Sequence, residues 1–220
     1  MSALLLSLII KTFFFQSFWI PSESMENTLV DGDRILVSKW RPGPLELRHG
    51  DVVVFKDPNS WLQHDPSDDP TGLHKVGNEI LTFTGLLPED AGEHLIKRIV
   101  GLPGDTVICT DPDAQVQVNG KYMDEPYVKP GTLPCGRAFE ITVPDGYLWV
   151  MGDNRDNSAD SRAHMGEPGG GTIPIENVVG TTFAVVWPFE RWTGMGNPFN
   201  EDTAPPAPSV ATGPVQTSSD

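Results

Sequence analysis

Glycine and proline interrupt this chain so often that long, uninterrupted helices are not expected over most of its length. The sequence has 22 glycines and 21 prolines, and its apolar stretches are mostly short. Short apolar runs bounded by turn residues are typical of β-strands. With 220 residues, 38% of them hydrophobic, the chain can bury one core and a smaller appendage. The sequence therefore predicts a mainly β protein of one or two domains.

Alternating apolar and polar side chains, and short apolar runs between turns, predict the individual strands. The expected strands span residues 33–39, 52–55, 94–100, 106–109, 115–122, 139–143, 147–151 and 178–187. The segment 115–122 contains Asn119-Gly120, a pair favoured in tight hairpin turns. We expect residues 106–143 to form a β-rich subdomain.

Two segments depart from this strand pattern. Proline, aspartate and glycine are concentrated around residues 57–72, and residues 72–87 have loosely helical spacing, which predicts an inserted irregular and helical excursion over residues 57–93. From about residue 197 the chain is rich in proline, serine, threonine and alanine and has almost no large apolar residues. We expect this tail, residues 197–220, to be disordered.

Residues 1–20 are almost wholly apolar apart from Lys11 and a few small polar side chains. About 20 apolar residues suffice to span a bilayer as a helix, and a lysine at its centre is costly. No small-residue cleavage site closes the stretch, so we expect a retained membrane anchor helix whose amino end need not be complete. Aromatic residues at 13–15, 18 and 19 suit the headgroup region. A buried core helix is the weaker alternative, because the stretch is apolar all round.

Charge and cysteine content exclude several classes of function. Acidic residues outnumber basic ones 30 to 15, giving a net charge of −15, which would repel a phosphate backbone, so no nucleic-acid partner is expected. The two cysteines, Cys109 and Cys135, lack the spacing of a zinc site, so we expect no metal and no cofactor. In an oxidising compartment they could form a disulfide that stabilises the fold by about 3 to 4 kcal/mol; in the cytosol they would remain thiols.

Two short segments carry residues that suit nucleophilic catalysis. In residues 21–25, an extended chain places the hydroxyls of Ser22 and Ser24 on one side, so that one could react while the other donates a hydrogen bond. In the strand 94–100, alternation requires either Lys97 or Arg98 to face an apolar layer. Burial lowers the pKa of a lysine toward the range in which it can accept a proton. Each segment alone also fits a plain loop serine or charges at a sheet edge.

A dense polar loop over residues 152–162 follows the apolar strand 147–151. It fails the calcium-loop pattern, since Arg155 and Ser158 replace a ligand and the turn glycine, and His164 stands where a bidentate glutamate is needed. Paired acidic and arginine side chains that support a nearby site are the better interpretation, with a structural turn as the alternative.

Taken in order, these segments resemble the bacterial type I signal peptidases (peptidase family S26), Ser/Lys proteases that release signal peptides from exported proteins. The matching blocks are SMENTL at 24–29, GDRILVSK at 32–39, KRIVGLPGD at 97–105 and GDNRDNSADSR at 152–162. The chain departs from the family at Asn27, where a proline is usual. The resemblance implies the complex β-fold of that family.

The resemblance also implies a role for each matching residue. Ser24 would be the nucleophile and Lys97 its general base, while Ser22 and the Ser24 backbone N–H would form the oxyanion hole. Ser158 would orient the lysine amine. The supporting residues would be Asp153, Asp160 and Arg162.

The implied substrate is an extended preprotein segment with an Ala-x-Ala-like site. The implied location is the cell membrane, with residues 21–196 as an extracytoplasmic catalytic domain on a single-pass anchor, in contact with lipid and monomeric. A self-cleaving Ser/Lys regulator would need a DNA-binding head, which the apolar amino end does not offer. An inactive membrane-anchored β-rich binding module is the alternative from another class.

Overall fold

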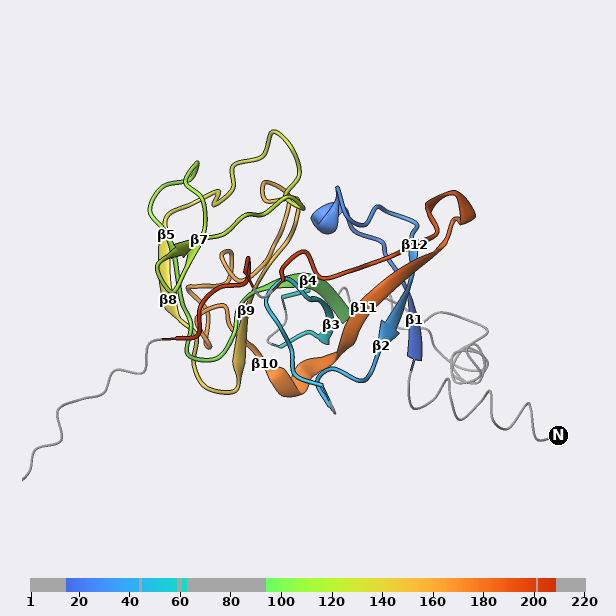
Figure 1. Cartoon of the computed structure of the whole chain (residues 1–220), viewed down its shortest axis with the longest axis horizontal. Coiled ribbons are helices and arrows are strands. Elements are labelled where there is room, and N and C mark those ends of the chain that lie inside the picture. The colour runs from blue at the N-terminus through green and yellow to red at the C-terminus, as the bar shows by residue number, and fades with distance from the viewer. Residues whose placement is uncertain (1–14, 44, 59–60, 63–93, 201, 209–220) are drawn as a thin grey trace, which may run out of the picture.

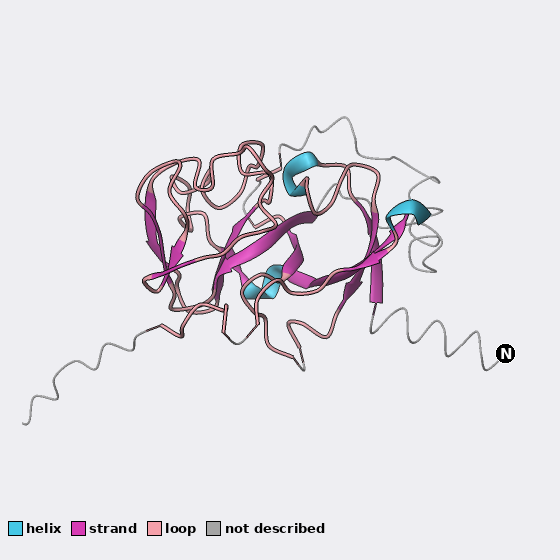
Figure 2. Ribbon diagram, turned by 45° about the horizontal axis from the view of Figure 1, so that its top comes forward, coloured by secondary structure: helices cyan, strands magenta, loops and turns pink. Residues whose placement is uncertain are grey.

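Antiparallel β-sheets and long loops make up nearly all of the part of the chain that the computed structural model describes, namely residues 15–43, 45–58, 61–62, 94–200 and 202–208 (Figures 1 and 2). Helical structure in this part consists of short 3-10 turns. The prediction of a mainly β protein is confirmed. No helix within the described residues is both long and apolar enough to cross a membrane.

The larger sheet has eight strands in the order β1-β2-β11-β3-β4-β9-β10, with β12 paired to β11. Its strands are β1 (Phe15–Trp19), β2 (Arg34–Ser38), β3 (Val52–Lys56), β4 (His94–Gly101), β9 (Tyr147–Met151), β10 (Ile173–Pro174), β11 (Val178–Trp187) and β12 (Thr193–Gly194). The 3-10 turns are η1 (Glu23–Met25), η4 (Ile175–Asn177) and η5 (Phe189–Arg191). Apart from β1 and the short β10 and β12, each of these strands matches an expected segment.

Strand β3 shows why the larger sheet is stable. Val53 and Phe55 belong to one buried cluster, whereas Val52 and Val54 belong to another. Because successive side chains of a strand point to opposite faces, β3 is covered by apolar side chains on both faces. Burying each such side chain contributes about 1.5 to 3 kcal/mol. The centre of this sheet is therefore a rigid support for the neighbouring strand β4.

The expected membrane anchor does not extend to residue 20. Residues 15–19 form β1, which pairs with β2 from Phe15 opposite Ser38 to Trp19 opposite Arg34. Phe18 is buried in the core of the sheet, while Phe15 and Trp19 are exposed. A strand with aromatic side chains on both faces has an apolar composition similar to that of a membrane helix. Composition therefore did not distinguish this strand from the end of the expected anchor helix. Residues 1–14 lie outside the described part of the chain.

The smaller sheet has four strands in the order β7-β6-β5-β8 (Figure 1). They are β5 (Thr106–Cys109), β6 (Gln117–Val118), β7 (Lys121–Tyr122) and β8 (Phe139–Thr142). Asn119 and Gly120, both at positive φ, form the turn between β6 and β7. Cys109 and Cys135 form a disulfide on this sheet. The sheet spans the segment that was expected to be a β-rich subdomain.

The first part of the tail, which we expected to be disordered, is held by the sheets; residues 201 and 209–220 lie outside the described part of the chain. Residues 197–200 and 202–208 run from the larger sheet to the smaller one and pack on both (Figure 1). We call these residues the C-terminal strap. Most of the expected excursion 57–93 lies outside the described residues, but its start is held by the core: Trp61 is 8% exposed and stacks on His164.

Candidate active site

Ser24 and Lys97 meet although 73 residues separate them in the sequence. Ser24 lies in η1, whose first turn is capped by Ser22, and Lys97 lies in β4. The Lys97 Nζ atom is 2.7 Å from Ser24 Oγ and donates a second hydrogen bond of 2.9 Å to the Ile96 carbonyl. Both side chains are buried, Lys97 to 3% exposure. A hydroxyl and an amine are therefore in direct hydrogen-bond contact, as nucleophilic catalysis requires.

Burial changes the protonation of Lys97. Removal from water lowers the pKa of its amine, whereas the charges of Asp160 and Asp153 raise it. Burial is the larger effect, and the pKa falls from 10.5 to about 8. A sizeable fraction of the amine is therefore neutral near pH 8 and can accept the proton of Ser24.

Arg98, next to the lysine, is also buried, and its charge is fully matched. Its guanidinium makes two hydrogen bonds to the Asp153 carboxylate, of 2.8 and 2.6 Å, and donates a third to the Gly50 carbonyl. The ring of Tyr127 lies under the guanidinium, 4.0 Å from its centroid. Burial lowers the pKa of Arg98, but the bonds to Asp153 outweigh it and the pKa is raised. The sequence predicted one buried cation in this strand; the structure buries two.

Asp160 forms a second buried ion pair at the site. Arg162 donates to its two carboxylate oxygens at 2.9 and 2.8 Å, and the Gly152 N–H donates to it at 2.9 Å. Burial raises the pKa of Asp160, but these hydrogen bonds and the arginine charge lower it more. Arg162 also donates to the Cys135 carbonyl. The pair thereby links the loop 152–162 to the disulfide-bonded part of the chain.

Ser158, which we expected to orient the lysine amine, makes no hydrogen bond to it among the described residues. Among the described residues, Lys97 Nζ bonds to Ser24 Oγ and the Ile96 carbonyl. The buried Ser158 Oγ makes no hydrogen bond of good geometry in this part of the chain, although it lies near enough to Asp160 to help lower the pKa of that carboxyl.

Ser22 and the Ser24 backbone N–H, the expected oxyanion donors, are adjacent. The Ser24 N–H donates to Ser22 Oγ at 3.2 Å. A substrate carbonyl would have to replace the Ser22 oxygen as the acceptor of that N–H before both groups could donate to it.

Asn27 occupies a backbone conformation that excludes the proline usual in the family. Its φ angle is 93°, whereas proline is restricted to about −65°. The Asn27 side chain donates a 3.0 Å hydrogen bond to the Tyr127 carbonyl. Asparagine tolerates positive φ better than most residues. The turn after Ser24 is therefore held by this side-chain hydrogen bond and not by a proline ring.

Sequence reasoning missed the segment that carries Tyr127. The Tyr127 hydroxyl donates to Glu125, which also pairs with Arg155 at 2.5 Å. The Lys129 side chain pairs with Glu26, two residues after Ser24, and the Lys129 backbone N–H donates to the Asp153 carbonyl. No local pattern marks these residues, because their role depends on contacts between distant segments.

A small, mainly apolar cavity of about 110 Å³ adjoins the Ser24 and Lys97 side chains. Its apolar walls include Ile20, Val54 and Ile96. On β4, strand β3 pairs with one edge from His94 to Arg98, while β9 pairs with the other edge only from Arg98 onward. Among the described residues, no strand pairs with that second edge at Leu95–Lys97.

Comparison with known proteins gives the same family as the sequence blocks. The family model for signal peptidase, peptidase S26, matches residues 1–187. A probable signal peptidase I of Mycobacterium leprae (strain TN) is 41% identical over 217 residues, which cover 86% of this chain and 74% of the relative. Signal peptidase I T of Bacillus subtilis (strain 168) is 32% identical, covering 86% of this chain and 82% of the relative.

Among solved structures, a signal peptidase I from Enterococcus faecalis V583 aligns over 62% of this chain and 97% of its own, with 23% identity and a TM-score of 0.39. The family assignment rests on the family model and the sequence relatives. The chain belongs to the signal peptidase family, peptidase S26.

Proposed function

We propose that this protein is a Ser/Lys endopeptidase that cleaves signal peptides from exported preproteins. One observation carries the proposal: the buried amine of Lys97, with its pKa lowered to about 8, lies 2.7 Å from the hydroxyl of Ser24. A serine hydroxyl is a weak nucleophile unless an adjacent base accepts its proton. The pair supplies both groups without a histidine.

In the proposed reaction, the neutral amine of Lys97 takes the proton of the Ser24 hydroxyl while Oγ attacks the carbonyl carbon of the scissile bond. The carbonyl oxygen becomes an oxyanion, which accepts hydrogen bonds from the Ser22 hydroxyl and the Ser24 N–H. The ammonium of Lys97 then protonates the leaving amine, and the C–N bond breaks to leave an acyl-enzyme on Ser24. A water molecule, deprotonated by Lys97, hydrolyses this ester and restores the serine.

The substrate is proposed to bind as an extended strand along β4. The edge at Leu95–Lys97 that no described strand occupies offers backbone groups for such pairing. The cavity of about 110 Å³ beside Ser24 suits a side chain no larger than a few carbon atoms. These two features support cleavage after small residues, as in an Ala-x-Ala-like site.

The catalytic domain is proposed to lie on the extracytoplasmic face of the cell membrane, with a single-pass anchor preceding β1. The disulfide between Cys109 and Cys135 suits an oxidising compartment. Exposed aromatic side chains at Trp187, Phe189 and Trp192 suit the headgroup region of a bilayer.

Cleavage of a preprotein with an Ala-x-Ala site by detergent-solubilised full chain, compared with Ser24→Ala, tests the proposal. Mass spectrometry should locate a single cut after the final alanine, made by the wild type alone. No cut by either protein, with the wild type well folded by circular dichroism, would favour the inactive binding module instead.

A further inference from the structure

The C-terminal strap joins the two sheets. After β12 the chain leaves the larger sheet and crosses to the smaller one (Figure 1). On the smaller sheet, Lys121 Nζ donates to the carbonyls of Asp202 and Ala204, and the Asn119 side chain donates to the Pro206 carbonyl. The far end of the strap is therefore fixed by three hydrogen bonds.

The near end of the strap clamps the turn formed by residues 48–51. Asn197 Nδ2 donates to the His49 carbonyl and to Asp51 Oδ1, both at 2.8 Å, and its own Oδ1 accepts the Phe199 N–H. The Phe199 ring lies against Gly50, where a Cβ would come within 2.7 Å of a ring carbon. Gly50 has a φ of +81°, so both the space and the backbone require glycine.

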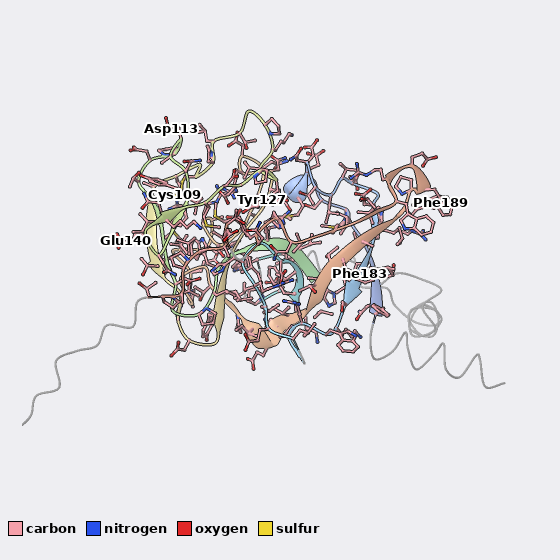
Figure 3. All side chains as sticks on the ribbon, in the orientation of Figure 1. Cys109, Asp113, Tyr127, Glu140, Phe183 and Phe189 are labelled. Atoms are coloured by element: carbon pink, nitrogen blue, oxygen red, sulfur yellow. A yellow bond between two sulfur atoms is a disulfide. The ribbon has the colours of Figure 1, made fainter. Side chains whose placement is uncertain are left out.

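Phe199 also supports Tyr127. The two rings meet edge to face, with centroids 6.1 Å apart and planes at 82°. Tyr127, near the centre of the molecule in Figure 3, lies under Arg98, and Gly50 accepts a 2.8 Å hydrogen bond from the same guanidinium. Arg98 is thus held by Asp153, Thr28, the Gly50 carbonyl and the Tyr127 ring, and the Phe199 ring contacts the last two of these.

We propose that Phe199 is a positioning residue for the catalytic base Lys97, acting through Arg98. This inference rests on the proposed function. Loss of the Phe199 ring leaves a cavity behind the 48–51 turn and Tyr127, and both can then move away from the guanidinium. Arg98 would then neutralise the Asp153 carboxylate less completely, and this carboxylate acts on the charge of Lys97.

The direction of the effect follows from the charges around the pair. Asp153 and Asp160 face Lys97 and raise its pKa, while burial lowers it. Asp153, Tyr127 and Arg155 face Arg98. A less neutralised Asp153 favours the ammonium form of Lys97. Weakening this support therefore raises the pKa of the base and reduces the neutral amine at pH 7.

The test compares Phe199→Ala with Phe189→Ala in the full chain. Phe189 is 65% exposed and lies at the right-hand side of the view in Figure 3, well away from the central Tyr127, so it serves as an aromatic control. We expect Phe199→Ala to shift the rising part of the pH profile of kcat/KM to higher pH by about one unit. At pH 7 this corresponds to a roughly tenfold lower kcat/KM, and at pH 10 the difference from wild type should largely disappear. Phe199→Leu should restore most of the wild-type profile.

A second readout does not depend on turnover. Competitive acetylation with acetic anhydride across pH, with the Lys97 peptide quantified by mass spectrometry, gives the titration midpoint of this amine directly. If wild type cleaves no preprotein but the midpoint still rises in Phe199→Ala, the proposed function fails and the positioning role stands.

An unchanged midpoint in folded Phe199→Ala, or an equal shift in Phe189→Ala, would overturn the proposal. Should Phe199→Ala fail to fold, Asn197→Ala decides, because it releases the same turn from the strap and must raise the midpoint. A wild-type midpoint in folded Asn197→Ala would then refute the role.

Discussion

The pH dependence of cleavage is the sharpest test of the Lys97 base. The pKa of the amine falls from 10.5 to about 8 on burial, and a difference of about 2.5 units corresponds to roughly 3 kcal/mol against the ammonium form. With a pKa near 8, about one tenth of the amine is neutral at pH 7, about half at pH 8 and about nine tenths at pH 9. If only the neutral amine accepts the proton of Ser24, activity follows these fractions.

We therefore expect kcat/KM to rise about tenfold between pH 7 and pH 9 and then to level off. The assay measures initial rates on a peptide with an Ala-x-Ala site, whose own charge should not change over this range. Lys97→Arg, which keeps the positive charge but cannot lose its proton, should be inactive throughout. A flat profile from pH 7 to 9, or a midpoint near the ordinary lysine value of 10.5, would refute the argument from burial.

Three further outcomes are expected. Lys97→Met should have a larger free energy of unfolding than wild type at pH 7. This difference should shrink by about 3 kcal/mol between pH 8 and 10.5, because over that range unfolded wild type binds a proton that the folded protein does not. Equal urea unfolding curves at pH 7 would contradict this. Asp153→Asn removes the carboxylate partner of the buried Arg98 and should lower the free energy of unfolding in urea by about 3 to 5 kcal/mol. A loss below about 1 kcal/mol would contradict this prediction. Replacing Cys109 and Cys135 by serine opens a loop with a sequence separation of 26 and should cost about 3.5 kcal/mol, so an unchanged Tm would refute the stabilising role.

Local patterning was sufficient for most strands of the larger sheet. Strands β3, β4, β9 and β11 appear where short apolar runs end at glycine, proline or charged residues, because burial on both faces selects such runs. Strand β1 was missed since its apolar residues continue those of the preceding segment without a turn. Periodicity alone does not separate a buried strand from part of a membrane helix.

The roles of Ser24 and Lys97 were predicted by resemblance, whereas strand alternation predicted only that one of Lys97 and Arg98 would face an apolar layer. The residues behind the contact between Ser24 and Lys97 could not be predicted. Tyr127 contacts Arg98 from the loop between β7 and β8, Phe199 of the tail contacts Tyr127, and neither aromatic residue lies in a recognisable motif. The composition of the tail predicts disorder on average, yet Asn197 and Phe199 fix its start to the 48–51 turn, and Lys121 and Asn119 hold its continuation on the smaller sheet.

The hydrogen bond between the Ser24 N–H and Ser22 Oγ has a consequence for inhibitors. An uncharged carbonyl that approaches the resting site must break this bond, which is worth about 0.5 to 1.5 kcal/mol, and gains a similar bond in return. An anionic tetrahedral adduct, such as one formed by a boronic acid on Ser24, gains charge-assisted bonds that are about twice as strong. The resting geometry therefore discriminates against ground-state mimics and in favour of compounds that resemble the transition state.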